Sequence, residues 1–348
     1  MIPAKGYAAQ SPTTPLAPWN FERREVGPHD VQIEILYCGV CHTDIHQTRD
    51  EWGGAVFPMV PGHEIVGKVI KVGGHVKNFK PGDIAGVGVI VDSCETCSNC
   101  KNDFEQYCTD GVTFTYGSME RDGSMITYGG YSNTIVTKEH FVLHVSDKLK
   151  LSGVAPLLCA GITTYAPLRY WNVGKGDKVA VLGLGGLGHM AVKFAASFGA
   201  EVTVLSTSPH KEADAKKLGA HKFILTSDEE KIKGAENYFD FIVDAVSAPH
   251  DYNMYLNMLN TDGTLIVVGI PPEAAKIEIG TLIGNRRKIG GSIIGGIKET
   301  QEMLDYCAEH GIVSEVEVIP INLINQAYER ILKNDVKYRF VIDMQSLV

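Results

Sequence analysis

The order of apolar and polar residues divides the chain into two parts with different periodicities. Up to about residue 150, short β-branched runs such as VQIEILYCGV and EIVGKVIKVG are interrupted every few residues by Gly, Pro or Asp. This pattern predicts an antiparallel, barrel-like β domain. From about residue 174, apolar strands such as DKVAVLG, EVTVLS and GTLIVVG alternate with helical segments. That alternation is typical of a parallel, doubly wound α/β sheet.

Two domains are therefore expected, and a length of 348 residues agrees with more than one hydrophobic core. We predict a β-rich domain over residues 1–150 and a nucleotide-binding α/β domain over residues 151–294. Residues 295–348 are expected to return to the first domain, because a helical LINQAYERIL precedes a closing strand KYRFVIDM.

Composition and charge narrow the classes of partner. The net charge is −9 and acidic and basic residues are interleaved, which argues against nucleic-acid binding. The chain shows neither a signal-peptide pattern nor an apolar run long enough to cross a membrane. We therefore expect a soluble cytoplasmic protein, in which eight cysteines are better suited to metal binding or chemistry than to disulfides.

Four of these cysteines lie close together in CETCSNCKNDFEQYC. Their spacing is C-x2-C-x2-C-x7-C, and they are Cys94, Cys97, Cys100 and Cys108. A tight loop with this spacing can supply four thiolates to one structural zinc ion, in a lobe over about residues 92–110. An iron-sulfur cluster is the chemical alternative at such a spacing.

A second group of metal-binding residue types occurs in CGVCHTDIH and VPGHE. Cys41, His42, Thr43, Asp44 and His46 lie in the first segment, and His63 and Glu64 lie in the second. Thiolate and imidazole together suit zinc, while nearby hydroxyl and carboxylate groups suit its supporting shell or a proton path. Cys38 and Cys307 are assigned to core packing.

The segment GLGGLG indicates a dinucleotide site, because it follows the apolar strand KVAVL and opens a helix that is expected to begin near Gly186. Glycines permit a tight turn and close approach of the backbone to a pyrophosphate at the helix N-terminus. The residues of this turn are Gly183, Leu184, Gly185, Gly186, Leu187 and Gly188.

The next strand ends in VLSTSPHK, where an NAD-binding protein would carry an acid for the ribose hydroxyls. Hydroxyls and a lysine can instead bind a 2′-phosphate, which predicts NADP(H). The residues concerned are Ser206, Thr207, Ser208 and Lys211. The alternative is that Ser208 only caps the helix of PHKEADAKKL and that Lys211 is solvated.

These motifs together resemble the zinc-dependent medium-chain alcohol dehydrogenases along essentially the whole chain. SIIGGIKETQEMLDYCAEHGI and VKYRFVID are similar to the cinnamyl alcohol dehydrogenase group and its bacterial NADPH-dependent aldehyde reductases. The resemblance implies a GroES-like catalytic domain, a Rossmann domain and a homodimer.

The resemblance also implies site residues. It places a catalytic zinc on Cys41, His63 and Cys159, with Glu64 as an occasional fourth ligand and a separate structural zinc on the four-cysteine loop. It makes Thr43 the hydroxyl at the substrate oxygen, Asp44 a supporting carboxylate and His46 the end of a proton relay. The residues implied around the nicotinamide are Thr163, Gly269, Ser292, Ile293 and Ile294.

The chemistry that follows is the interconversion of primary alcohols and aldehydes with NADP(H), working mainly as aldehyde reduction. Trp52, Phe57 and Tyr116 are candidate walls of a substrate pocket, because an aryl aldehyde would pack on aromatic side chains. The alternatives are a non-catalytic NADP(H)-binding sensor on the same fold and a zinc-ribbon nucleic-acid module. Retention of every ligand and of Thr43 argues against the sensor, and the acidic charge argues against the module.

Overall fold

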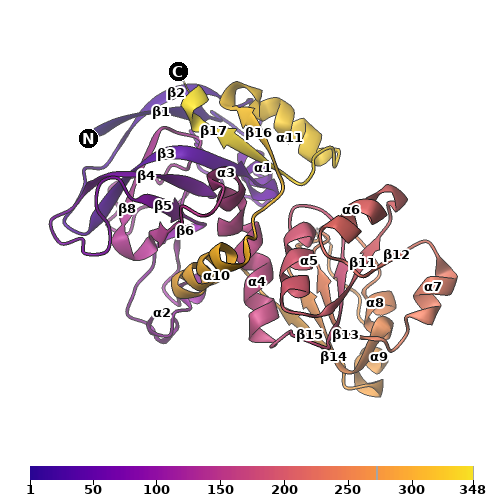
Figure 1. Ribbon diagram of the computed structural model, residues 1–348. Helices are drawn as coiled ribbons and strands as arrows, with labels where there is room; N and C mark the ends of the chain where they lie inside the picture. The colour runs from indigo at the N-terminus through magenta and orange to yellow at the C-terminus, as the bar shows by residue number, and fades with distance from the viewer. Residues whose placement is uncertain (272, 348) are drawn as a thin grey trace. The chain divides into compact units, whose positions relative to one another are not determined.

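The computed structural model describes residues 1–271 and 273–347 of the chain, which divides into two units (Figure 1). Unit 1 comprises Met1–Ile162 and Gly295–Val348, and unit 2 comprises Thr163–Ile294. The second domain was expected from residue 151, but residues 151–162 group with unit 1. The reason is packing: α3 (Leu151–Val154) and η3 (Ala155–Leu158) contact strands β3 and β4 of unit 1.

Unit 1 is built on β structure, as the short interrupted runs predicted. A seven-stranded sheet has the order β16-β17-β3-β4-β5-β9, with β8 also paired to β3, and two smaller sheets pair β1 with β2 and β6 with β7. The strands are β1 (Ile2–Ala8), β2 (Ala17–Arg23), β3 (Asp30–Val40), β4 (Ile65–Val72), β5 (Ile84–Val87), β6 (Ile90–Asp92), β7 (Thr113–Phe114), β8 (Thr134–Lys138), β9 (Leu143–His144), β16 (Val316–Pro320) and β17 (Arg339–Asp343).

Strand β3 organises unit 1 because it is long and buried along most of its length. Its first half pairs with β8, its second half pairs with β17, and β4 lies along its other edge. Val31, Ile33 and Phe340 are fully buried members of the resulting core. The helices of this unit are α1 (His42–Thr48), α2 (Ser98–Lys101), α10 (Ile297–His310) and α11 (Ile324–Leu332), in addition to α3.

Unit 2 contains a six-stranded parallel sheet in the order β12-β11-β10-β13-β14-β15. The strand order reverses between β10 and β13, which is where doubly wound sheets bind ligands. The strands are β10 (Lys178–Leu182), β11 (Glu201–Ser206), β12 (Lys222–Leu225), β13 (Phe239–Asp244), β14 (Leu259–Val267) and β15 (Lys288–Gly291). This topology confirms the predicted Rossmann-type domain.

Helices connect these strands and cover the sheet. They are α5 (Gly188–Ser197), α6 (Glu212–Lys217), α7 (Glu229–Gly234), α8 (Tyr252–Met258) and α9 (Ile279–Gly284), and α4 (Ala160–Tyr170) contains the division between the units. Helix α5 packs on β10 and β11, and α8 packs on β14. The helix expected near Gly186 begins at Gly188, because the residues before it form the glycine turn.

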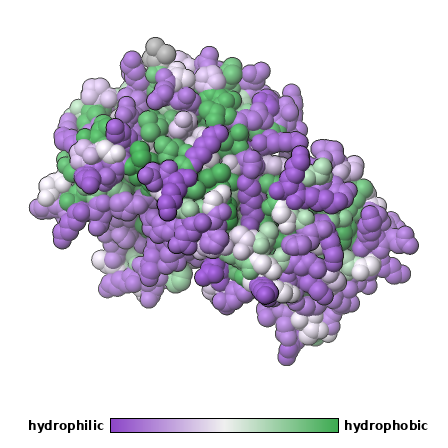
Figure 2. All heavy atoms as spheres, in the orientation of Figure 1, coloured by the Kyte–Doolittle hydropathy of each residue, from purple (hydrophilic) through white to green (hydrophobic). Residues whose placement is uncertain are grey.

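The visible surface is mostly hydrophilic, with smaller apolar areas between polar ones, in agreement with a mean hydropathy near zero (Figure 2). Within the described ranges, no single helix is both long and apolar enough to cross a membrane. The bent pair Leu151–Leu158 and Ala160–Tyr170 meets those criteria only when the two helices are taken together.

Candidate active site

Four potential metal ligands from distant parts of the sequence converge in unit 1. One ligand atom from each of Cys41, His63, Glu64 and Cys159 lies within 4.8 Å of the others. Cys41 is the residue before α1, His63 and Glu64 immediately precede β4, and Cys159 follows η3. The Cys41 and Cys159 sulfurs are 4.0 Å apart. The structure thus brings together the set that the resemblance implied.

The pairing of β3 with β4 explains how the ends of the two strands meet. Cys38 lies opposite Ile65, and the Gly39 N–H donates to the Glu64 carbonyl at 2.9 Å. A Cβ on Gly39 would lie 1.9 Å from Glu64 Oε2, so only glycine leaves room for that carboxylate. Cys38 itself is fully buried in the core, as predicted.

The electrostatics of the cluster fit a divalent cation with sulfur, nitrogen and oxygen ligands. Glu64 Oε1 accepts a hydrogen bond from Arg339, whereas the buried Oε2 has no partner among the described residues. Burial raises the pKa of Glu64 to about 7, although Arg339 opposes that rise. Hydrogen bonding to Cys159 lowers the pKa of Cys41 well below its usual value, which favours a thiolate. The same hydrogen bond raises the pKa of Cys159, so the pair shares one proton more readily than it loses two. Two cysteine sulfurs, an imidazole and an orphaned carboxylate oxygen are zinc ligand types.

Asp44 supports the metal ligands through hydrogen bonds to the segments that carry them. Its buried carboxylate accepts the backbone N–H of Cys41 at 2.9 Å and that of Gly62 at 3.1 Å. It also lies 3.2 Å from His63 Nδ1 and accepts the Tyr131 hydroxyl at 3.2 Å. A carboxylate bonded to one imidazole nitrogen directs the other nitrogen toward the metal. Burial lowers the pKa of His63, but Asp44 and Cys41 outweigh that effect and raise it well above its usual value.

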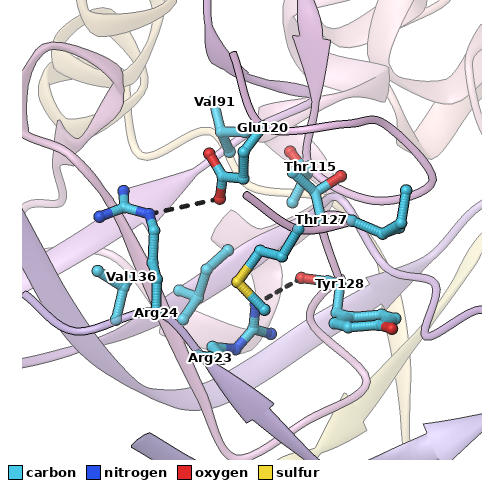
Figure 3. Close-up of a pocket in the computed structure, with 11 residues that line it drawn as sticks. Arg23, Arg24, Val91, Thr115, Glu120, Thr127, Tyr128 and Val136 are labelled. Atoms are coloured by element: carbon cyan, nitrogen blue, oxygen red, sulfur yellow. Dashed lines mark hydrogen bonds and ion pairs between the residues drawn. The ribbon is translucent and has the colours of Figure 1, made fainter. Parts of the chain in front are cut away.

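Arg23 anchors the segment that carries Tyr131. Its buried guanidinium donates to the carbonyls of Tyr128 and Gly129 and to the Ser132 hydroxyl, at 2.7, 2.9 and 2.9 Å. Figure 3 shows Arg23 beside Tyr128 in a pocket that Arg24 and Glu120 also line. This pocket holds about 20 Å³, roughly the room one water needs, so it is too small for a substrate. What matters here is that the Arg23 side chain in this pocket is hydrogen-bonded to residues 128–132.

The four-cysteine loop forms a separate metal site. One sulfur from each of Cys94, Cys97, Cys100 and Cys108 lies within 4.8 Å of the others. The Cys94–Cys100 and Cys97–Cys100 sulfur separations are 3.9 and 3.5 Å, and a tetrahedral zinc site with bonds of about 2.3 Å spaces its sulfurs roughly 3.8 Å apart. The backbone N–H of Cys100 donates to Cys97 and is the main reason why the pKa of Cys97 falls to about 5. Backbone hydrogen bonds also lower the pKa of Cys94, whereas burial raises that of Cys100 to about 12. Four sulfurs at these separations fit a structural zinc.

The glycine turn lies in unit 2, between β10 and α5. Gly183 has φ of +86°, a conformation that side chains rarely adopt. A Cβ on Gly188 would lie 1.9 Å from the Gly183 carbonyl oxygen, so the helix can approach the strand this closely only with glycine. The ten-residue α5 then directs its first N–H groups toward the carboxyl edge of the sheet, the position at which doubly wound folds hold a pyrophosphate.

The predicted phosphate site follows the adjacent strand β11. Ser206 is buried, Thr207 is exposed and Ser208 is half-buried. Lys211 reaches back to the glycine turn and donates to the Leu184 carbonyl at 3.0 Å. Burial lowers the pKa of this ammonium. The sheet edge therefore carries hydroxyls and one cation next to the glycine turn.

Ser208 stands at the N-cap position before Pro209, as the capping alternative expected, but it precedes a 3-10 helix and its side chain does not cap it. Residues Pro209–Lys211 form a short 3-10 helix, α6 begins only at Glu212, and the Ser208 side chain makes no capping bond. The Ser208 N–H instead donates to Ser206 Oγ at 3.1 Å. Ser208 Oγ is thus not used for capping, which favours the anion-binding interpretation of this segment.

Comparison with known proteins agrees with both units. Residues 27–147 match the family model described as alcohol dehydrogenase GroES-like domain, and residues 186–309 match the model described as zinc-binding dehydrogenase. The chain is 52% identical over 348 residues to NADP-dependent alcohol dehydrogenase C 1 of Mycolicibacterium smegmatis, covering 100% of this chain and 99% of that protein. This chain belongs to the zinc-containing medium-chain alcohol dehydrogenase family.

Further relatives place this dehydrogenase in the group of cinnamyl alcohol dehydrogenases and aldehyde reductases. It is 52% identical over 345 residues to aldehyde reductase YahK of Escherichia coli, covering 99% of each chain. The crystal structure of CAD from Helicobacter pylori complexed with NADP(H) superposes with a TM-score of 0.93 at 44% identity, covering 99% of each chain. The predicted family and the GroES-like and Rossmann-type domains are confirmed.

The residues predicted to form a proton relay in this dehydrogenase lie on α1. Thr43 is in its first turn and His46 follows three positions later, so the two side chains neighbour each other on one helix face. His46 Nδ1 lies 2.5 Å from Glu51 Oε2, and the imidazole stacks on Trp52 with ring centroids 4.8 Å apart. Glu51 received no role from the sequence, and its nearness to His46 was the only available signal.

The three candidate pocket aromatics lie in different environments. Trp52 is 49% exposed beside His46, and Phe57 packs against the core of unit 1. Tyr116 is buried and stacks on the ligand imidazole of His63, with ring centroids 5.9 Å apart. The geometry favours Trp52 as a wall open to a substrate, whereas Tyr116 supports a metal ligand.

The residues implied around the nicotinamide all lie in unit 2. Gly269 follows β14, and a Cβ there would be 2.4 Å from the Val246 carbonyl oxygen. Ser292, Ile293 and Ile294 follow β15, and the Ser292 N–H donates to the Val267 carbonyl at 3.2 Å. Thr163 is buried in α4. In the segment GSIIGG only Gly291 belongs to β15, and Ile293 is 51% exposed.

Arg339 and Tyr131 are the residues of the metal site that the sequence analysis missed. Both act over long sequence separations, since Arg339 contacts Glu64 and Tyr131 contacts Asp44. The one available signal for Arg339 was a charged residue at the start of the otherwise apolar closing strand. Tyr131 follows two glycines in TYGGYSN and offered no signal of its own.

Proposed function

We propose that this chain is a zinc-dependent, NADP(H)-linked alcohol dehydrogenase that works mainly as a reductase of aromatic and aliphatic aldehydes in the cytoplasm. The observation that carries the proposal is the complete cluster of Cys41, His63, Glu64 and Cys159 in one buried site. The names of the relatives, an NADP-dependent alcohol dehydrogenase and an aldehyde reductase, support the same substrate class and cofactor. A non-catalytic sensor has no need of such a set.

In the proposed reaction, zinc and NADPH would have different roles from the side chains of this protein. Cys41, His63 and Cys159 would hold a zinc ion, which would supply Lewis-acid polarisation of the carbonyl, and a bound NADPH would supply the hydride. Thr43 is assigned to hydrogen bonding at the substrate oxygen on the strength of the family resemblance, and it lies in the first turn of α1 directly after the ligand Cys41. His46 is assigned to proton exchange with solvent, with Glu51 holding its Nδ1 and leaving Nε2 for transfer.

Zinc analysis and initial rates test this proposal. We expect two zinc ions per chain and NADPH-dependent reduction of an aromatic aldehyde such as benzaldehyde. Cys159→Ser should lower the zinc content by about one per chain and abolish turnover. The control is Cys307→Ala, which changes a buried cysteine of α10 outside both clusters and should keep both zinc ions and activity. Wild-type protein without zinc and without turnover would refute the proposal.

Cofactor preference is tested separately at the phosphate site. Ser206→Asp places a carboxylate where the sequence otherwise offers hydroxyls and Lys211, so it should repel a 2′-phosphate. We expect the dissociation constant for NADPH to rise much more than that for NADH, which serves as the internal control. An equal loss of affinity for NADPH and NADH would contradict the proposal that this segment binds the 2′-phosphate.

We further propose a homodimer formed through the edge of the unit 2 sheet. Strand β15 is the terminal strand, and large apolar side chains are exposed on it and near it. They are Ile279, Ile283, Ile289 and Ile293. An unpaired, apolar edge next to an apolar helix suits isologous pairing with a second copy. Ile289→Lys should yield a monomer by light scattering, whereas Ile70→Lys, at an equally exposed isoleucine of unit 1, should leave the dimer intact.

A further inference from the structure

A buried acid-base pair lies at the cofactor edge of unit 2 and has no part in the site described above. Asp244 is the last residue of β13 and is fully buried. Strand β13 lies between β10 and β14, and Asp244 is in register with Leu182 on one side and Val267 on the other. Asp244 therefore sits at the carboxyl ends of the strands where their order reverses, the place at which such sheets bind dinucleotides.

Asp244 fixes the turns that follow two strands. Its Oδ1 accepts the Val246 N–H at 3.0 Å, and its backbone carbonyl accepts the N–H groups of Val268 and Gly269 at 3.0 and 3.1 Å. Val246 in turn abuts the glycine turn, because a Cβ added to Gly183 would lie 2.7 Å from Val246 Cγ2. The Asp244 carboxylate thus sets the position of the residue that packs against the first glycine of GLGGLG.

His250 completes the pair. Its Nδ1 lies 2.8 Å from the Ala248 carbonyl oxygen and its Nε2 lies 3.0 Å from Asp244 Oδ2. A carbonyl only accepts, so Nδ1 carries a proton, and Nε2 either donates to a carboxylate or accepts from a carboxylic acid. The imidazole also stacks on Tyr252, with ring centroids 4.4 Å apart. Both ends of the 244–250 loop are therefore tied to one buried carboxyl group.

Nothing else in this loop accounts for the presence of a buried carboxyl. A carboxyl group at a fully buried position destabilises the fold unless its partners are held in place, and an apolar residue would end β13 without that penalty. Burial raises the pKa of Asp244 while His250 opposes the rise. The other titratable side chains near the pair are the phenols of Tyr252 and Tyr255 on α8, with Asp251 at the start of that helix.

We propose that Asp244 and His250 are positioning residues for the dinucleotide, holding the 244–250 loop as a rigid wall beside the glycine turn. The inference rests on the proposed function in that the dinucleotide is NADP(H). The hydrogen bonds described above for Asp244 and His250 all lie within residues 244–269, and none of them involves Ser206 or Ser208. Its loss should weaken binding of the part that NADPH and NADH share, whereas Ser206→Asp should discriminate between them.

The test measures cofactor binding rather than turnover. Titration of NADPH and of NADH by fluorescence gives both dissociation constants for the zinc-loaded, full-length wild type and for Asp244→Ala, Asp244→Asn and His250→Phe. Asp244→Ala removes the carboxyl group, and His250→Phe keeps a ring on Tyr252 but removes both hydrogen bonds. We expect each to raise both constants about tenfold or more, since a bond to a charged group is lost.

Two variants serve as controls. The Asp244→Asn amide can accept the Val246 N–H and donate to an unprotonated Nε2, so it should restore binding to within about threefold of wild type. His310→Phe is the same substitution at an exposed histidine of α10 in unit 1, which also stacks on a tyrosine and bonds a carbonyl through Nδ1, and it should not change binding. At saturating cofactor, kcat with an aldehyde should stay within about twofold of wild type for every variant that binds.

The outcomes are distinguishable from a failure of the proposed function. If Asp244→Ala and His250→Phe are folded by circular dichroism and bind both cofactors as tightly as wild type, the inference is overturned. Asp244→Asn binding as weakly as Asp244→Ala would also overturn it. If the wild type binds NADPH but reduces no aldehyde, the proposed function fails, while the binding comparison still decides the role of the pair.

Discussion

Tyr131→Phe tests whether the hydrogen bond from Tyr131 to Asp44, which supports the metal ligand His63, stabilises the fold. The substitution removes only one oxygen and leaves no large cavity, so its effect isolates the hydrogen bond to Asp44, which measures 3.2 Å. Hydrogen bonds to charged groups contribute about 1.5–3 kcal/mol. The three remaining contacts of Asp44, with Cys41, Gly62 and His63, keep it partly satisfied, so we expect a loss of about 1.5–2 kcal/mol in the free energy of unfolding.

Tyr328→Phe is the matched control. Tyr328 is buried in the same core as Tyr131, and its hydroxyl lies near those of Tyr131 and Thr48 but meets no hydrogen-bond geometry with any residue that the structure describes. Removing a buried, unpaired hydroxyl should leave stability unchanged or raise it by up to about 1 kcal/mol. The two variants therefore make the same chemical change, but only Tyr131→Phe should lower the free energy of unfolding.

Equilibrium urea unfolding of the zinc-loaded proteins, followed by circular dichroism, measures both values. Zinc retention against a chelator is the second readout. Asp44 orients His63, so a less firmly held Asp44 carboxylate should weaken zinc binding by His63. Tyr131→Phe should release zinc more readily than the wild type, and Tyr328→Phe should not. Equal stabilities and equal zinc retention in the two variants would refute the role of Tyr131.

Three further predictions concern other parts of the molecule. Gly188→Ala should destabilise unit 2 and abolish NADPH binding, because the new Cβ meets a backbone carbonyl, whereas Gly185→Ala meets no atom within 4 Å and should fold normally; thermal unfolding and cofactor titration check both. Cys97→Ser should lower the zinc content from about two to about one per chain and lower the melting temperature, while retention of both zinc ions would contradict the four-sulfur site. Glu105 raises the pKa of His140, so the stabilisation given by their bond is present at low pH and is lost as pH rises through that pKa. Urea unfolding should therefore show a larger deficit for His140→Gln at pH 6 than at pH 9, and a pH-independent deficit would contradict this.

The sequence was most informative where chemistry depends on local spacing. The four-cysteine loop and the glycine turn each lie within one short segment, so their residues and their roles could be predicted together. The strand and helix alternation after residue 174 likewise follows from local periodicity, and the structure confirms it as a parallel sheet. The family resemblance then supplied Cys41, His63 and Cys159, which spacing alone did not connect.

Contacts between segments far apart in the sequence could not be predicted from the sequence. Arg339 lies 275 positions after Glu64, and Arg23 lies 106 positions before Gly129, so no periodicity relates them. Ser208 shows a different limit: Ser-Pro is a good start signal for a helix, but the chain first makes a 3-10 turn and the serine side chain does not cap it. The Asp244–His250 pair was also missed, since DAVSAPH reads as a strand end followed by a loop.

The interruption of unit 1 by unit 2 has a consequence for synthesis of the protein on the ribosome. Unit 2 is continuous, so it can fold as soon as residue 294 has emerged, whereas the sheet of unit 1 lacks β17 until residues 339–343 are made. Until then β3 presents an unpaired edge over Tyr37–Val40, and Glu64 is without its guanidinium partner. Ribosome-bound chains that end before Arg339 should therefore be the species most dependent on chaperones, and a premature stop near the C-terminus should damage the metal site at the other end of the sequence.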